Sequence, residues 1–217
     1  MREGHVKVTY FGFPGRAEPI RLALVIGGVE FEDERVAFSD WPVMKGKVPF
    51  GTLPVVEFDG AVIGQSIAAL MFVGKKTGLY PDDPISAARV DEILLYLHDF
   101  SSETVSTVWE RDSQLREKRV TKLMRQSLPE VLGRVEQILA QNGSGFCVGD
   151  AMTVADLFVF SICLQLTVYQ HENSLPSGTQ DLWPGLPHLL ALRRRINGHP
   201  AVRDWYLRQP SNLRALL

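Results

Sequence analysis

The sequence predicts two parts in series, an α/β layer with a mixed sheet over residues 1–80 and an all-α helical bundle over residues 85–217. Up to residue 80, stretches in which apolar residues alternate at every second position are interleaved with stretches of three- and four-residue spacing. These patterns are typical of strands and helices respectively. Beyond residue 84 the apolar patterns all have helical spacing. Residues 81–84, which begin and end with proline, form the predicted linker.

The elements of the first part follow from apolar spacing and from the turn residues that end each pattern. Gly27-Gly28 ends the first helical pattern, and Asp59-Gly60 is a hairpin signal between two short strands. The β-α-β-α-β-β-α order is that of a compact α/β layer. In chain order the predicted elements are a strand at 6–10, a helix at 17–24, a strand at 32–36, a short helix from Trp41, strands at 53–58 and 61–63, and a helix through 67–74.

The second part is predicted to contain helices only. The segment that begins at Thr153 is apolar on nearly all sides, which predicts a helix at the centre of the bundle. Thr153 and Asp156 have the spacing of a capping box, with aspartate in the position usually taken by glutamate. The other predicted helices cover residues 90–97, residues 120–138 with a bend at Pro129, residues 186–196 and residues 201–207.

Composition favours a cytoplasmic protein and argues against several classes of partner. The formal net charge of −2 supplies no field that would attract nucleic acid or an anionic membrane. Cys147 and Cys163 are the only cysteines, and their spacing suits neither a metal site nor a disulfide framework. The N-terminal region lacks the pattern of a signal peptide, and no apolar stretch is long enough to span a bilayer.

Residues 8–22, which read VTYFGFPGRAEPIRL, narrow the chemistry most. Tyr10 ends the first strand and Arg16 comes at the start of the following helix, so a phenol and a guanidinium lie beside the positive end of a helix. At neutral pH a phenol is a hydrogen-bond donor, and a thiolate is a species that such a site stabilises. The alternative is a tyrosine that packs at the edge of the core without a chemical role.

Three further segments contain candidate ligand-binding residues. Gln65-Ser66 marks the start of a helix, whose amides bind a carboxylate, although a serine there is also a common helix cap. Leu53-Pro54 precedes a strand, where a cis peptide bond would present the backbone to a peptide-like ligand and a trans edge proline is the alternative. Trp41 and Lys45 lie one helical turn apart and either offer an indole N–H and an ammonium to a carboxylate or are surface residues.

Together these segments resemble one known family over almost the whole chain. In order along the sequence they read YF…GRAEPIRL, DWP, PFGTLPVVEFDG, GQSIA and FCVGDAMTVADLFVF, followed by GLPHLLALRRRINGHPAV near the C-terminus. This set is similar to the cytosolic glutathione transferases. The tyrosine and the DWP and PFG segments favour the sigma class, which includes prostaglandin D synthases of the haematopoietic type.

The resemblance implies a thioredoxin-like N-terminal domain that binds glutathione and a helical domain that forms most of the electrophile pocket. Tyr10 would activate the glutathione sulfur, and Arg16 would support the thiolate. Phe50 would be an aromatic residue of a dimer interface or a core residue, and no metal is implied. Glutathione would be held by Trp41, Lys45, Thr52, Leu53, Pro54, Gln65 and Ser66, and by Asp99 reaching across a homodimer. The electrophile pocket would be lined by Phe11, Phe13, Val105 and Trp109.

Two alternatives remain on the same fold. Ser106 stands where prostaglandin synthases of this type have a pocket tryptophan, so prostaglandin isomerisation, like peroxide reduction, is an alternative to conjugation. A non-catalytic ligand-binding or crystallin-like protein is the other, although the residues implied to contact glutathione are present in this sequence. A thiol-disulfide oxidoreductase is excluded, because no cysteine precedes Cys147.

Overall fold

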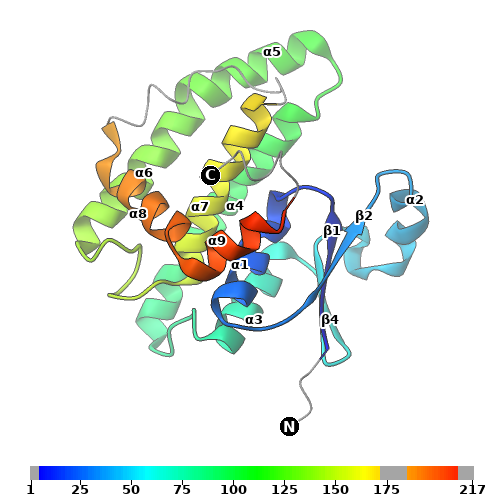
Figure 1. Ribbon diagram of the computed structural model, residues 1–217. Helices are drawn as coiled ribbons and strands as arrows, with labels where there is room; N and C mark the ends of the chain where they lie inside the picture. Colours follow the sequence, from blue (N-terminus) through cyan, green and yellow to red (C-terminus); the bar gives the residue numbers. More distant parts are fainter. Residues whose placement is uncertain (1–4, 172–184, 210–217) are drawn as a thin grey trace. The chain divides into compact units, whose positions relative to one another are not determined.

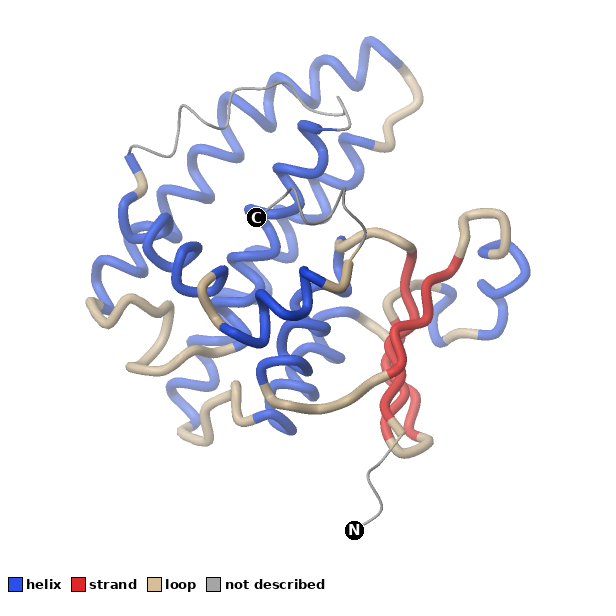
Figure 2. The backbone as a smooth tube through the Cα atoms, in the orientation of Figure 1, coloured by secondary structure: helices blue, strands red, loops and turns tan. Residues whose placement is uncertain are grey.

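The structure is a computed structural model that describes residues 5–171 and 185–209. The chain forms two compact units, Met1–Pro81 and Asp82–Leu217. All strands of the described residues lie in the first unit, and the described part of the second unit is helical (Figure 2). The predicted fold class, an α/β layer followed by an all-helical part, is therefore confirmed.

A four-stranded mixed sheet in the order β2-β1-β3-β4 forms the centre of the first unit. β1 runs parallel to β2 and antiparallel to β3, and β3 pairs antiparallel with β4 across the predicted hairpin turn. Tyr10 lies opposite Arg35 near the end of β1, so the register places this tyrosine at the end of a central strand. The strands are β1 (Val6–Phe11), β2 (Glu32–Val36), β3 (Val55–Phe58) and β4 (Ala61–Ile63).

Three helices accompany the sheet, and the order of strands and helices is the predicted one. α1 (Glu18–Ile26) follows a 3-10 turn at Gly15–Ala17. α3 (Ser66–Thr77) ends at Gly78, whose left-handed conformation closes the helix. α1 and α3 lie on one side of the sheet, and the short α2 (Trp41–Met44) lies on the other (Figure 1).

The segment between α2 and β3 departs from the prediction in one respect. Two 3-10 turns, Lys45–Lys47 and Pro49–Gly51, follow α2, and β3 then begins at Val55 and not at Leu53. Proline has no N–H to contribute to a strand ladder, so the strand begins after Pro54. The Leu53-Pro54 bond is cis, which confirms that part of the prediction.

Each predicted helix of the second unit is present, but the region predicted as one helix at 120–138 is divided, and its first part begins at residue 113. The predicted bend at Pro129 stays a prediction, and a π-helical turn at Leu123–Ser127 precedes the proline. Such a turn widens the helix just where the missing N–H of proline must be accommodated. The helices are α4 (Pro84–Val108), α5 (Ser113–Lys122), α6 (Leu128–Asn142), α7 (Val154–His171), α8 (Pro187–Asn197) and α9 (Pro200–Leu207).

α7 is buried along residues 154–166, as expected for a helix at the centre of a bundle. The fully buried Asp156 accepts hydrogen bonds from the backbone amides of Cys147 and Thr153, both at 2.7 Å. The Thr153 hydroxyl also donates to this carboxylate, at 3.1 Å, where a capping box would have the hydroxyl accept from the helix. The predicted pair is therefore in contact, and its carboxylate additionally fastens the preceding loop at Cys147.

Candidate active site

Tyr10 and the turn that follows it form the centre of the candidate site. β1 ends at Phe11, and α1 begins after the short 3-10 turn at Gly15–Ala17. The backbone amide of Arg16 donates a hydrogen bond of 3.2 Å to the hydroxyl oxygen of Tyr10. Because this oxygen accepts a bond from the amide, the hydroxyl proton is left to be donated to a ligand.

The protonation state of Tyr10 follows from its surroundings. Burial raises the pKa of the phenol above its ordinary value, and the Arg16 amide and the charges of Arg16 and Arg21 lower it by a smaller amount. The net direction is upward, so the side chain is a neutral phenol at neutral pH. Tyr10 is therefore suited to donate a hydrogen bond to an anion and not to act as a phenolate base.

Gly15 is required by the geometry of the turn. Its φ of +45° favours glycine, and a Cβ atom there would come within 2.6 Å of the Tyr10 hydroxyl oxygen. The same Cβ atom would lie 2.7 Å from the ring of Phe13. A side chain at position 15 would therefore displace the tyrosine, whereas Gly12 in the same turn has open space around it.

A cluster of aromatic side chains extends from Tyr10. Phe11 and Phe13 each contact the Tyr10 ring edge-on, with ring centroids 5.4 Å apart. Phe11 also stacks on Phe38 at 4.7 Å and meets Trp41 edge-on at 5.7 Å. Phe38 is 57% exposed, so the cluster presents an apolar surface beside the phenol. The structure thus brings the predicted site residues Phe11, Phe13 and Trp41 together with Tyr10.

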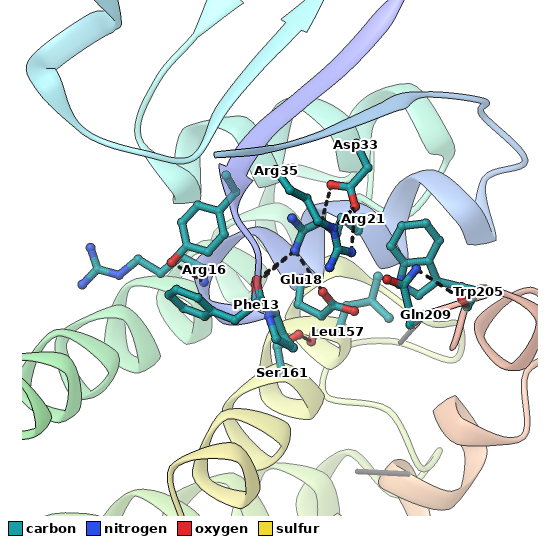
Figure 3. A network of polar contacts seen from close by, with 12 residues as sticks. Phe13, Arg16, Glu18, Arg21, Asp33, Arg35, Leu157, Ser161, Trp205 and Gln209 are labelled. Carbon is teal, nitrogen blue, oxygen red and sulfur yellow. Dashed lines mark hydrogen bonds and ion pairs between the residues drawn. The ribbon is translucent and has the colours of Figure 1, made fainter. Parts of the chain in front are cut away.

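A buried arginine fastens the same turn to α1 and to β2 (Figure 3). The Arg21 side chain has no exposed surface. Its Nη1 atom donates to the carbonyl oxygens of residues 13 and 14, at 3.2 and 3.3 Å, and to the Glu18 carboxylate at 3.2 Å. Its Nε atom donates to Asp33 at 2.8 Å. The turn beside Tyr10 is therefore held from within the first unit by charged groups.

Four of the predicted glutathione-binding residues lie between α2 and β3: Lys45, Thr52, Leu53 and Pro54. Lys45 is exposed and lies along Gly51, where a Cβ atom would be 3.5 Å from the lysine Cγ atom. Thr52 is exposed and Leu53 is half-buried, and both precede the buried cis Pro54. The structure therefore brings the lysine at the end of α2 close to the loop that contains the proline.

Gln65 and Ser66 stand at the start of α3, as predicted. Gln65 is the residue before the helix and has φ 65° and ψ 110°, a conformation that is uncommon for a residue with a side chain. Ser66 is the first helical residue and is buried. No side-chain hydrogen bond caps this end of the described helix, so the alternative of a capping serine is wrong. Backbone strain of this kind is often retained at functional sites.

Phe50 lies on the surface of the first unit. Its side chain is 77% exposed, and its backbone has a positive φ of 58°. The ring lies against Gly64, where a Cβ atom would be 3.2 Å from the Phe50 Cδ2 atom. The alternative that Phe50 is a core residue of this unit is therefore wrong.

The remaining predicted site residues belong to α4 of the second unit. Asp99 is exposed, Val105 is half-buried, and Trp109 is 60% exposed at the C-terminal end of the helix. Ser106 directs its hydroxyl to its own helix, where it donates to the Glu103 carbonyl at 2.9 Å. The roles of Asp99, Val105 and Trp109 stay predictions.

Sequence reasoning did not single out three residues that shape the site: Gly15, Arg21 and Phe38. The spacing of Arg21 contained a usable signal, because it lies three residues after Glu18 among apolar residues of α1. An arginine in an otherwise apolar helix segment indicates burial with charged partners. Phe38 lies in the loop after β2, and no periodic pattern predicts which way a loop side chain points.

Both cysteines lie in buried surroundings. Cys147 and Cys163 are free and buried, and burial raises the pKa of both thiols, to about 11 for Cys163. Residues 5–171 and 185–209 contain no group of three or more His, Cys, Asp or Glu side chains arranged to hold a metal ion. Within these ranges, no helix combines the length and the apolar character needed to cross a bilayer.

Two models of one protein family match this chain in series. The family model for the N-terminal domain of glutathione S-transferases matches residues 6–75. The model for the C-terminal domain of the same family matches residues 98–209. The chain belongs to the glutathione S-transferase family.

Individual relatives agree with this assignment over nearly the whole chain. Hematopoietic prostaglandin D synthase of Homo sapiens is 32% identical over 205 residues, which cover 94% of this chain and 96% of that protein. Glutathione S-transferase 1 of Ascaris suum is 32% identical over 209 residues, with the same two coverages. The solved structure of prostaglandin synthase D from Nilaparvata lugens has a TM-score of 0.85 at 27% identity and covers 95% of this chain and 98% of its own.

These findings confirm the resemblance predicted from the sequence. The chain is a glutathione transferase related to the hematopoietic prostaglandin D synthases, and glutathione is its co-substrate. The sigma class stays a prediction. Its N-terminal domain is thioredoxin-like, with a four-stranded mixed sheet.

Proposed function

We propose that Tyr10 activates glutathione by donating its hydroxyl proton as a hydrogen bond to the thiolate sulfur. The observation that carries this proposal is the bond from the Arg16 amide to the Tyr10 oxygen, which leaves the hydroxyl proton for a ligand. Its buried, neutral phenol supports the same role. The thiol releases its proton to solvent, the thiolate sulfur forms a bond to an electrophilic carbon, and the bond from that carbon to the leaving group breaks with its electron pair passing to the leaving group. Arg16 supports the thiolate electrostatically.

The glutathione molecule is proposed to lie along the first unit. Its γ-glutamyl carboxylate would bind at Gln65-Ser66, where the start of α3 supplies backbone amides and a partial positive charge. Its cysteinyl unit would pair with the Leu53 backbone before cis Pro54, next to Thr52. Its glycine carboxylate would bind Trp41 and Lys45, and the closeness of Lys45 to this loop supports that arrangement.

The electrophile is proposed to be hydrophobic. The exposed aromatic surface beside Tyr10, formed by Phe11, Phe13 and Phe38, supports an apolar substrate. Val105 and Trp109 of the helical unit are proposed to complete the pocket. Positioning of the electrophile against the thiolate would then supply much of the rate enhancement.

The chain is proposed to work as a cytoplasmic homodimer. Phe50 supports this proposal, because a phenylalanine that is 77% exposed on a turn is a natural contact for another protein surface. Asp99, which is exposed on α4, would reach the γ-glutamyl amine in the site of the second subunit. A site completed in this way would need both subunits.

Prostaglandin isomerisation is a second candidate function, because hematopoietic prostaglandin D synthases are among the relatives at 32% identity. The serine at position 106 argues against a pocket of the same shape. A comparison of turnover with a prostaglandin endoperoxide and with an aryl halide distinguishes the two functions. Turnover of the endoperoxide alone would favour the isomerase.

Replacement of Tyr10 by Phe tests the activating role. Tyr10→Phe is expected to lower kcat for conjugation of glutathione to an aryl halide at least tenfold, which corresponds to about 1.4 kcal/mol. Binding to immobilised glutathione should persist, because the contacts that hold the tripeptide are intact. Tyr80→Phe, which removes a hydroxyl elsewhere in the first unit, is the control and should keep the wild-type kcat. An unchanged kcat in Tyr10→Phe would contradict the proposal.

A further inference from the structure

We propose that Arg21 is a positioning residue for the Tyr10 phenol and acts through the turn at residues 13–16. Arg21 holds two carbonyl groups of this turn, and the turn in turn presents the Arg16 amide to the Tyr10 hydroxyl. The inference rests on the proposed role of Tyr10 and adds a residue to it. The guanidinium does not itself touch the hydroxyl or the reacting sulfur.

The hydrogen bond from the Arg16 amide to the Tyr10 hydroxyl is sensitive to small movements of the turn. The carbonyl of Pro14, which Arg21 binds at 3.3 Å, is followed after one residue by the Arg16 amide. That amide lies 3.2 Å from the Tyr10 oxygen, at the long end of the range for a good N–H···O bond. A movement of the turn by a few tenths of an ångström away from the tyrosine would therefore weaken the bond.

The Arg21 guanidinium is itself fixed by two carboxylates (Figure 3). Glu18 comes from the same helix, and Asp33 comes from β2, which pairs with the strand that ends in Tyr10. Arg35 holds the other oxygen of Asp33 at 2.8–2.9 Å and orients it. Arg21 therefore links the turn to the sheet that also contains Tyr10.

Stability alone is a weak explanation for this arginine. A buried ion-pair network is often no more stabilising than apolar side chains of similar volume. One Arg21 nitrogen, Nη2, is buried and has no hydrogen-bond partner among residues 5–171 and 185–209. The Cζ atom also lies 5.8 Å from the centroid of the Tyr10 ring, so a positive charge is kept beside the phenol. The two bonds to the turn and the charge beside the ring are both features that act on Tyr10.

A double-mutant cycle tests the inference, since residues that act through one another have non-additive effects. Arg21→Met is expected to lower kcat about tenfold with a change in the glutathione KM of less than threefold. In the Tyr10→Phe background the same substitution should change kcat less than twofold. Arg195→Met is the matched control, because Arg195 also donates to two loop carbonyl oxygens, those of Ser144 and Gly145, but that loop contains no predicted site residue. Its kcat should stay within threefold of wild type.

The thiolate absorbance of bound glutathione provides a readout that a loss of folded protein would not mimic. At fixed pH near 7, the thiolate fraction per bound glutathione should fall in Arg21→Met and stay unchanged in Arg195→Met. If Arg21→Met does not fold, Arg21→Lys replaces it, with an expected three- to tenfold loss of kcat because an ammonium cannot reproduce the planar fork.

The outcomes separate the two proposals. Unchanged kcat in a folded Arg21 variant, or equal losses with and without the Tyr10 hydroxyl, would overturn the role of Arg21 while Tyr10→Phe remains slow. Unchanged kcat in Tyr10→Phe alone would instead overturn the role of Tyr10, and the positioning role would fall with it. A loss of kcat on substitution of Arg21 that occurs only in protein that keeps Tyr10 supports both the role of Tyr10 and the role of Arg21.

Discussion

Arg21 in the first unit and Asp156 in the second unit are fully buried charged residues that perform similar structural tasks. Each fastens the chain in front of a helix, Arg21 through carbonyl oxygens before α1 and Asp156 through backbone amides before α7. The difference lies in what the fastened segment contains. The first includes the amide that binds the Tyr10 hydroxyl, whereas the second, around Cys147 and Thr153, includes no predicted site residue.

This comparison teaches that burial and charge alone do not identify a functional residue. A buried ionised group is costly in either unit and must be satisfied by hydrogen bonds. The two positions differ in the fastened segment itself: the turn held by Arg21 contacts the Tyr10 hydroxyl, and the segment held by Asp156 includes no predicted site residue. Substitutions around Asp156 should therefore alter stability alone, and substitutions around the turn at residues 13–16 should alter catalysis.

The largest expected effect is on stability, in Asp156→Ala. Removal of the carboxylate leaves the buried amides of Cys147 and Thr153 without their partner, at a cost of about 1–3 kcal/mol each. Urea unfolding followed by circular dichroism should show a loss of roughly 3 kcal/mol, with kcat per folded molecule unchanged. Asp150→Ala, an exposed aspartate in the same loop, is the control and should unfold like wild type. A loss of kcat without a loss of stability would remove the contrast with Arg21.

Gly15→Ala should produce the largest effect on catalysis. The added Cβ atom would meet the Tyr10 oxygen at 2.6 Å, so the phenol must move away from the position that it holds against Arg16. A fall in kcat of about a hundredfold is expected, equivalent to about 2.7 kcal/mol. The aryl halide assay measures it.

Gly12→Ala is the matched control for this substitution, because no atom lies within 4 Å of a Cβ at that position. It should keep kcat within about twofold of wild type. Equal losses in both variants would show that any change in the turn is harmful, and that the phenol position is not the cause.

The smallest expected effect concerns a second carboxylate that accepts hydrogen bonds from backbone amides, as Asp156 does. It is more exposed than Asp156 and binds at the start of α8. Glu136 of α6 accepts bonds from the amides of His188 and Leu189, at 3.0 and 2.8 Å. Glu136→Gln should destabilise the protein by about 1 kcal/mol at pH 7, as expected for loss of a charged helix cap. Thermal unfolding of the two proteins over a range of pH measures the difference.

The pH dependence of that difference has a definite sign. Burial tends to raise the pKa of Glu136, but the bonds from the two amides and the His188 ring together hold the pKa below its ordinary value of 4.5. A carboxyl group with a lowered pKa contributes its stability above the unfolded pKa and loses it as the pH falls through the folded one. The difference should therefore shrink as the pH falls below about 5, and a difference that grows in acid would contradict this origin.

Much of the fold could be predicted from the sequence because apolar spacing reports it directly. The hairpin at Asp59-Gly60, the end of α1 at Gly27-Gly28 and the central position of α7 follow from local patterns that the structure retains. The π-helical turn at Leu123–Ser127 could not be predicted in this way. An extra residue in one helical turn leaves the apolar spacing on either side almost unaltered.

The candidate site was only partly predictable for a related reason. Tyr10, Gln65 and cis Pro54 stand at the ends of strands and helices, where sequence signals are strong. The clearance at Gly15 and the carbonyl contacts of Arg21 depend on side chains that meet across the turn, and a one-dimensional pattern does not contain such distances. The exposure of Phe50 is likewise a property of the folded loop.

The charged sequence of β2 has a consequence for self-association. β2 is an edge strand of the described sheet, with a row of backbone groups that another chain could extend into a continuous sheet. Four consecutive charged residues, Glu32–Arg35, discourage such strand addition. Because Asp33 also anchors Arg21, the feature that holds the turn beside Tyr10 belongs to the same segment that protects the sheet against aggregation.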